Sequence, residues 1–113
     1  MYKRQVPAGL DVVLCGYSFG ADVSLSVAHE RVVAWVALCP PLRLVPLDEL
    51  VAAADARPTH LLVAEHDEIA APDRAREVTA SWTSTSIEII PGADHFLAGS
   101  LGRVVEAVAA RLP

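Results

Sequence analysis

Three side chains in the 113-residue sequence are of the types that together perform nucleophilic chemistry: Ser18, Asp67 and His95. A serine hydroxyl is barely ionised at neutral pH and needs a base before it can attack. A histidine within hydrogen-bonding reach can take that proton, and a carboxylate can hold the imidazole ring in the right tautomer. The three residues follow one another in the order serine, aspartate, histidine, which is the order associated with a nucleophile elbow.

Ser18 lies in the segment Gly16-Tyr17-Ser18-Phe19-Gly20, which fits the Gly-x-Ser-x-Gly pattern of such an elbow. An elbow is a sharp turn from a strand into a helix, and its strained central residue needs small neighbours. Gly16 and Gly20 are predicted to supply that room. Because three fixed positions in five occur by chance, a tight loop that holds an ordinary serine also fits the pattern.

The elements around these residues are predicted from apolar runs and helical spacing. Four apolar runs indicate strands, and the first run is expected to be buried on both faces: 10–14, 32–38, 59–64 and 86–90. Apolar residues at helical spacing indicate about three turns of helix from residue 21 and three further helices: 47–54, 72–82 and 101–112. The alternation predicts an α/β fold, with a mostly parallel sheet of about four strands flanked by helices.

The three reactive side chains each come just past the end of a predicted strand. Ser18 follows the first strand, Asp67 the third and His95 the fourth. The carboxyl ends of parallel strands meet at one edge of a sheet, and ligands bind outside that edge. We therefore expect the three side chains to converge there.

The composition excludes several classes of function. The net charge is −5 and there is no basic run, so neither nucleic acid nor a membrane is an expected partner. Cys15 and Cys39 each end an apolar run and are predicted to be buried thiols in a reduced compartment. No apolar run approaches the length of a membrane span and no signal peptide opens the chain, so a cytoplasmic location is expected. We expect no metal and no cofactor.

Three segments resemble motifs of the α/β-hydrolase family: 16–20 with its elbow, 63–67 with the acid, and Gly92-Ala93-Asp94-His95-Phe96 with the histidine. Together they resemble the C-terminal half of small, lid-free bacterial members, from about residue 10 to residue 112. The resemblance implies hydrolysis of an ester, thioester or amide of a small acyl substrate through an acyl-enzyme. It implies Ser18 as nucleophile, His95 as general base and then acid, Asp67 as the group that orients it, and the backbone N–H of Phe19 as an oxyanion donor.

The chain also departs from the family's pattern. The family has further strands before the elbow and a loop there that supplies a second oxyanion donor, and no segment of this chain corresponds to them. We therefore expect residues 10–113 to be the C-terminal part of such a domain, with its elbow strand at a sheet edge through which the chain self-associates. Residues 1–5 resemble a translated sequencing adaptor and are expected to be foreign, the alternative being a genuine basic N-terminus.

Alternatives to these assignments remain open from the sequence. Asp94 and Asp73 are the other candidates for the acid, and His95 could be an ordinary turn histidine. The run 65–68 could suggest a metal cluster, but adjacent ligands on one turn rarely point the same way; His66 is expected to be solvated. The alternative function is a non-catalytic α/β-hydrolase-like interaction domain, or an inactive fragment.

Overall fold

The structure is a computed structural model that describes residues 9–112, so the prediction about residues 1–5 lies outside the described residues. Its four strands are β1 (Val12–Tyr17), β2 (Val32–Leu38), β3 (Thr59–Ala64) and β4 (Thr85–Ile90). Its α-helices are α1 (Phe19–Leu25), α2 (Pro72–Thr79) and α3 (Leu101–Ala109), and two 3₁₀ turns, η2 (Leu47–Glu49) and η3 (Val51–Ala54), lie between β2 and β3.

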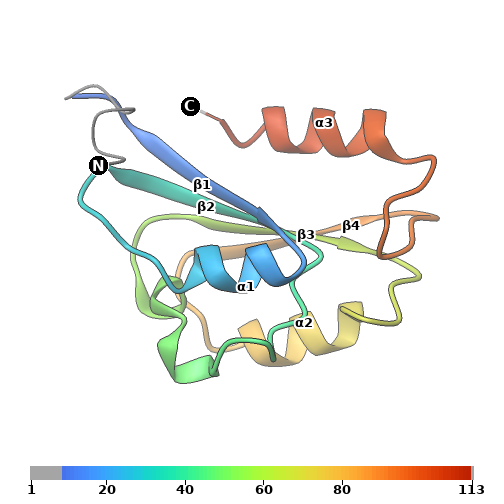
Figure 1. Ribbon diagram of the computed structural model, residues 1–113, viewed down its shortest axis with the longest axis horizontal. Helices are drawn as coiled ribbons and strands as arrows, with labels where there is room; N and C mark the ends of the chain where they lie inside the picture. Colours follow the sequence, from blue (N-terminus) through green and yellow to red (C-terminus); the bar gives the residue numbers. More distant parts are fainter. Residues whose placement is uncertain (1–8, 113) are drawn as a thin grey trace.

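The four strands form one parallel sheet in the order β1-β2-β3-β4 (Figure 1). The register aligns Tyr17 with Leu38, Leu38 with Leu62, and Ala64 with Ile90, so that all four strands end at the same edge. This confirms the predicted parallel sheet. Because β1 stands at the end of the order, its outer side has no strand partner among residues 9–112.

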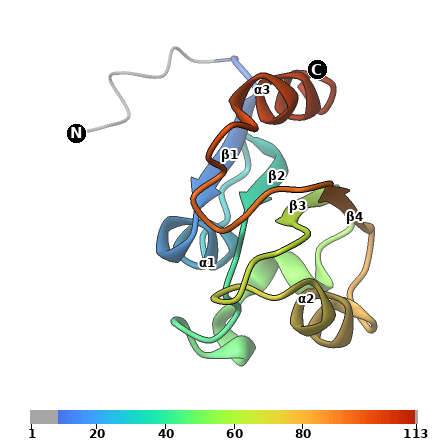
Figure 2. The same cartoon turned by 90° about the vertical axis from the view of Figure 1, so that its right-hand side faces the viewer.

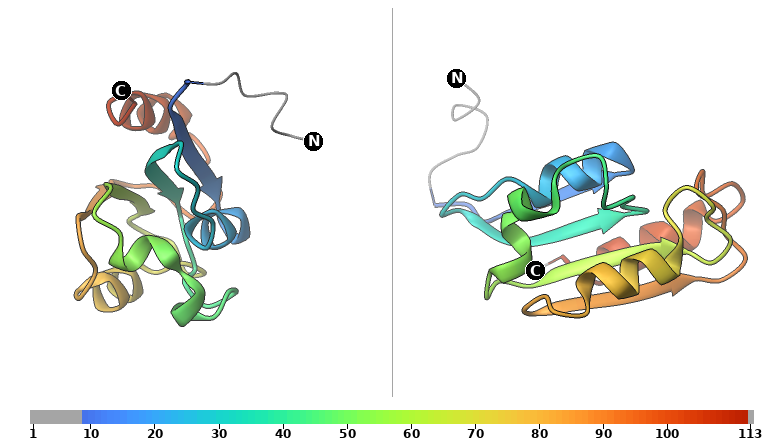
Figure 3. Two further views of the ribbon diagram at one scale, coloured as in Figure 1. Left: turned by 90° about the vertical axis from the view of Figure 1, so that its left-hand side faces the viewer. Right: turned by 90° about the horizontal axis from the view of Figure 1, so that it is seen from below.

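Helices cover both faces of the sheet and make two separate apolar cores. Helices α1 and α2 lie on one face and α3 lies on the other, as the views in Figures 2 and 3 show. Side chains alternate between the faces along each strand. The first core therefore holds Trp35, Leu61 and Val63 against α1 and α2. The second holds Val36, Leu62 and Ile90 against α3.

The first strand is not buried on both faces, contrary to the prediction. No residue of β1 is fully buried, and the side chain of Cys15 is exposed. The apolar run alone predicted burial on both faces, whereas the departure from the family's pattern predicted that this strand lies at a sheet edge. Among residues 9–112 β1 does lie at the edge, and water reaches a strand that lacks a neighbour on one side. Cys39, at the end of the inner strand β2, is fully buried as predicted.

The three α-helices end earlier than predicted, and the segment 47–54 is not an α-helix. Helix α1 ends at Leu25, after about two turns, where the hydroxyls of Ser24 and Ser26 bond to carbonyls three residues earlier. Side chains that bond to the local backbone in this way favour helix ends over helix interiors. The segment 47–54 forms η2 and η3 instead of an α-helix because Leu50, with φ −82° and ψ 84°, interrupts it and turns into the core.

The predicted last helix is present, but only some of its apolar side chains are buried against the sheet. Val104 and Ala107 of α3 face the sheet and are buried. Leu101, Val105 and, just beyond the helix, Leu112 are exposed. No helix of residues 9–112 has the length and apolarity that crossing a membrane requires.

Candidate active site

Ser18 occupies the sharp turn between β1 and α1. Its backbone has φ 54° and ψ −122°, a region that costs a residue with a side chain about 1–3 kcal/mol. The surrounding backbone holds it there: the Ser18 amide donates to the carbonyl of Leu38 at 2.8 Å, and the Ser18 carbonyl accepts from the amide of Ala21 at 2.9 Å. The segment is therefore a strained strand-to-helix turn, as the motif predicts.

The two glycines of the motif have different parts in this turn. A Cβ on Gly16 would lie 2.2 Å from the carbonyl oxygen of Gly20 and 2.7 Å from the amide nitrogen of Ala21, distances that no real side chain accepts. A Cβ on Gly20 would meet no described atom within 4 Å. The turn therefore requires a residue without a side chain at position 16, whereas the packing makes no such demand at position 20. The prediction that Gly20 supplies room as Gly16 does is not supported by these distances.

A continuous chain of hydrogen bonds joins the three predicted side chains. The hydroxyl of Ser18 lies 2.8 Å from Nε2 of His95, and Nδ1 of His95 lies 2.7 Å from Oδ2 of Asp67. Both distances are in the range of good hydrogen bonds. The Asp67 side chain is fully buried and that of His95 is 7% exposed, so water does not compete for the bond between them.

The carboxylate of Asp67 is fixed from its other side. Its Oδ1 accepts from the backbone amides of Ile69 and Ala70, at 2.8 and 2.6 Å. These bonds close the turn after β3 and orient the second oxygen toward His95.

The rival acids lie elsewhere. Asp73 is an exposed partner of Arg76 at 3.2 Å, and Asp94 accepts from the amide of Phe96 at 3.0 Å, which is the loop-capping role expected of it. His66 is exposed beside Glu65, as predicted. The structure therefore brings Asp67, rather than Asp73 or Asp94, to His95.

Tyr17 tethers the histidine turn, a contact that the sequence interpretation missed. Its hydroxyl donates to the backbone carbonyl of His95 at 2.6 Å, and the two rings lie 5.6 Å apart. The ring of Phe96 stands edge-on to that of His95 at 5.5 Å. The signal for Tyr17 was its place inside the elbow motif, directly before Ser18.

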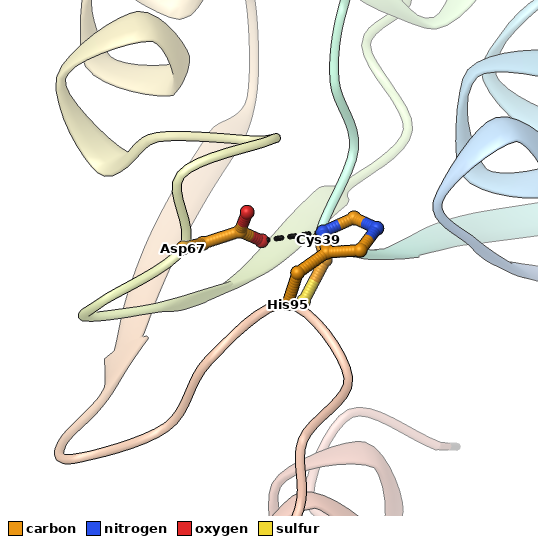
Figure 4. A group of neighbouring side chains, drawn as sticks. All are labelled: Cys39, Asp67 and His95. Carbon is orange, nitrogen blue, oxygen red and sulfur yellow. Dashed lines mark hydrogen bonds and ion pairs between the residues drawn. The ribbon is translucent and has the colours of Figure 1, made fainter.

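Cys39 is the other group at this edge that the sequence did not connect with the site. Its sulfur, a carboxylate oxygen of Asp67 and a ring nitrogen of His95 all lie within 4.8 Å of one another (Figure 4). Burial, followed by the charge of Asp67, raises the pKa of the Cys39 thiol to about 12, so the thiol is protonated at neutral pH. These residue types can bind a metal ion, but such an ion would have to replace the bond of 2.7 Å between Asp67 and His95. The sequence feature that could have linked Cys39 with the site is its position just past the end of a strand, which it shares with Ser18, Asp67 and His95.

A buried carboxylate on α1 holds the loop that follows β2. Asp22 is completely buried, and its two oxygens accept from the backbone amides of Leu42, Arg43 and Leu44 at 3.0 to 3.2 Å. The backbone of Leu42 has φ 59°, so these bonds hold a strained turn. The signal in the sequence was an acid beside Ala21 on the buried face of the helix.

The same loop is joined to the segment that carries Asp67. The guanidinium of Arg43 donates to the carbonyl of Ile69, and that of Arg74 donates to the carbonyl of Leu42 at 2.8 Å. Through this loop the helix behind Ser18 and the turn behind Asp67 are held in one framework.

The fold is similar to part of the fold of known α/β hydrolases. No protein-family model matches the sequence, and no curated protein matches it. Among solved structures, an α/β serine hydrolase homologue from Coxiella burnetii matches with a TM-score of 0.77 and 24% identity, over 91% of this chain and 50% of that one. Est1E from Butyrivibrio proteoclasticus matches with a TM-score of 0.72 and 15% identity, over 95% and 62%. The esterase domain of a protein from Rhodothermus marinus matches with a TM-score of 0.68 and 20% identity, over 88% and 60%.

These likenesses show the fold. The chain has a partial α/β-hydrolase fold, with a four-stranded parallel sheet and three helices, as the resemblance of its motifs predicted. It spans between half and two thirds of the length of these three solved structures.

Proposed function

We propose that this chain carries the catalytic groups of a serine hydrolase, which cleaves an ester, thioester or amide of a small acyl substrate through an acyl-enzyme. One observation carries the proposal. The hydroxyl of Ser18, the imidazole of His95 and the carboxylate of Asp67 form a continuous hydrogen-bonded chain that begins at a strained turn. This is the arrangement that activates a serine hydroxyl.

Each group has a definite part in the proposed reaction. His95 takes the proton from Ser18 as the oxygen attacks the acyl carbon, and it then gives that proton to the leaving group. Asp67 holds the ring and stabilises its positive charge during the step. In the second half of the cycle His95 takes a proton from a water molecule that attacks the acyl carbon, and it returns that proton to the Ser18 oxygen as the bond between that oxygen and the acyl carbon breaks.

The developing oxyanion would be stabilised by the amide of Phe19. Helix α1 begins at Phe19, and amides in the first turn of a helix have no partner within it. A donor aimed at the oxyanion typically contributes about 10²–10³ in rate. The family's second donor comes from a loop before the elbow, and we expect this chain alone to be slower by a factor of that size.

The surroundings of Ser18 favour a small substrate with an apolar part. The rings of Phe19 and Phe96 are 56% and 72% exposed, at the elbow and beside His95. Residues 40–46, between β2 and η2, are tied down by Asp22 and are too few to form a lid.

Turnover of p-nitrophenyl acetate and butyrate tests the proposal. We expect hydrolysis above the buffer rate for the 113-residue chain, loss of it in Ser18→Ala, and unchanged hydrolysis in Ser26→Ala, whose hydroxyl is exposed and bonds locally. Equal rates for the chain and for Ser18→Ala would contradict it.

A non-catalytic interaction domain is the second candidate, and one observation favours it. The outer side of β1 has no strand partner among the described residues, and α3 exposes apolar side chains. A folded chain that binds a partner through this edge, and that shows no Ser18-dependent hydrolysis, would support this second function.

A further inference from the structure

The acceptor sites of Asp67 are incompletely filled by the bonds described so far. A carboxylate has about four lone-pair sites. Two backbone amides fill two sites on Oδ1, and Nδ1 of His95 fills one on Oδ2. Because the side chain is fully buried, the remaining acceptor site on Oδ2 can be filled only by a donor from within the protein.

The thiol of Cys39 is the donor at hand. It is fully buried, its sulfur lies within 4.8 Å of the Asp67 carboxylate, and it stands beside the Asp67–His95 pair in Figure 4. Burial, followed by the charge of Asp67, raises the pKa of the Cys39 thiol. The thiol therefore stays protonated, and the Asp67 carboxylate is near enough to accept a hydrogen bond from it.

The backbone at Cys39 is a second, independent observation. Its φ is 50°, in the left-handed region that glycine and asparagine adopt with least strain. The amide of Cys39 donates to the carbonyl of Leu62 at 2.8 Å, which anchors the residue in this conformation. A cysteine stands where the backbone favours glycine, so its side chain must offset the strain.

We propose that Cys39 is a positioning residue whose S–H donates to the carboxylate of Asp67, holds that carboxylate against His95, and weakens its pull on the ring proton. The inference deepens the proposed function and rests on it for its catalytic meaning. The hydrogen bond itself can be tested without any activity.

The consequence for pH dependence follows from the charges. A donor on Asp67 shares its negative charge, so removing the donor strengthens the attraction between Asp67 and a protonated His95 ring. The acidic limb of any reaction that needs the neutral imidazole then moves to higher pH.

Asp94 and Tyr17 are further ionisable groups near Cys39 and the Asp67–His95 pair. Asp94, in the histidine turn, and Asp67 are the charged groups that act on the Cys39 thiol. Tyr17, at the end of β1, donates to the His95 carbonyl, and its own pKa is raised, first by burial. Cys39 is itself among the groups that raise the Tyr17 pKa, after burial, so a substitution at Cys39 removes that contribution while Asp94 and the tyrosine hydroxyl remain.

Infrared spectroscopy of the S–H stretch tests the hydrogen bond directly. The chain has two cysteines, so Cys15→Ala leaves Cys39 as its single thiol. We expect the Cys39 band at lower frequency than the band of the same thiol in urea-unfolded protein, and a rise in frequency on adding Asp67→Asn. A band at the unfolded frequency overturns the proposal, as does the absence of an S–H band, which an ionised or metal-bound thiol would give.

The effect on His95 is tested by the pH profile of Ser18 labelling with a fluorophosphonate. We expect Cys39→Ala to move the acidic limb upward by about half a pH unit or more, and Cys39→Ser, which keeps a donor, to leave it at or below its original position. Cys39→Gly also removes the donor but relieves the backbone strain, so it should show the same shift as Cys39→Ala with a better-folded chain. Lower labelling at every pH with no movement of the limb means a packing role only and overturns the proposal. If the unsubstituted chain is not labelled, the proposed function fails while the infrared result still decides the hydrogen bond.

Discussion

Gly16 lies so close to Gly20 that a Cβ added to Gly16 would stand 2.2 Å from the carbonyl oxygen of Gly20. We therefore predict that Gly16→Ala lowers the free energy of unfolding by about 3 kcal/mol or prevents folding, because backbone atoms cannot move aside as a flexible side chain can. Urea denaturation followed by circular dichroism measures the loss.

Gly20→Ala is the matched control. A Cβ there meets no described atom within 4 Å, and alanine is favoured over glycine within a helix by up to about 1 kcal/mol. We expect the free energy of unfolding to stay the same or to rise slightly. A loss as large as that of Gly16→Ala would show that the turn is packed differently.

Asp22 should be a strong determinant of stability although it contacts none of the three reactive side chains. In Asp22→Ala the amides of Leu42, Arg43 and Leu44 lose their acceptor. A buried donor left unsatisfied costs roughly 1–3 kcal/mol; the Leu42 bond is buried and the other two are partly buried, so we predict a loss of about 2 kcal/mol or more in the free energy of unfolding.

The comparison for Asp22 is Asp73→Ala, which removes a carboxylate whose side chain is 96% exposed. Its effect should stay within about 0.5 kcal/mol. Comparable losses for the two variants would contradict the structural role given to Asp22.

Cys39 should also make the protein sensitive to alkali. Burial raises the pKa of its thiol to about 12 from 9.0, so between about pH 9 and pH 12 the unfolded chain releases a proton that the folded chain retains. The stability that this thiol contributes is complete below pH 9 and is lost as the pH rises through that window.

The prediction is tested by measuring the free energy of unfolding of the chain and of Cys39→Ala from pH 8 to about pH 12. The stability advantage of the original chain over the variant should shrink as the pH rises. Cys15→Ala, which removes an exposed thiol, controls for general thiol effects. An advantage that stays constant across the range would show that Cys39 titrates at its ordinary pKa.

The outer side of β1 is where we expect the chain to associate with itself. Unpaired strand edges present backbone donors and acceptors to other chains, and lysine is a residue that natural edges use to prevent this. Sedimentation velocity should show association that increases with concentration and that falls in Cys15→Lys, since Cys15 is exposed on β1. A chain that stays monomeric at every concentration would remove this expectation.

The sequence was sufficient for the parallel sheet and for the convergence at its edge because both follow from the order of apolar runs. Runs that alternate with helical spacing leave few arrangements, and side chains just past the strand ends then lie together. That reasoning predicted that Ser18, Asp67 and His95 lie together. In the structure the Ser18 hydroxyl is 2.8 Å from His95 Nε2, and Asp67 Oδ2 is 2.7 Å from His95 Nδ1.

The exposure of β1 and the supporting groups could not be predicted in the same way. An apolar run looks the same at the edge and at the centre of a sheet, so the run led to a wrong prediction that Cys15 is buried, although the resemblance placed this strand at an edge. Asp22 and Tyr17 act through backbone groups far along the chain, and such partners leave no spacing pattern. Leu50 breaks a helical pattern because its burial in the core outweighs a weak local preference.

The most direct test of the central claim is labelling of the purified 113-residue chain with a fluorophosphonate, located by peptide mass spectrometry. We predict an adduct on Ser18 that is absent from Ser18→Ala, is strongly reduced in His95→Gln, and weakens as the pH is lowered, because a protonated imidazole cannot accept the serine proton. A folded chain that carries no adduct on Ser18, or that is labelled equally well in His95→Gln, would contradict the claim that His95 activates Ser18.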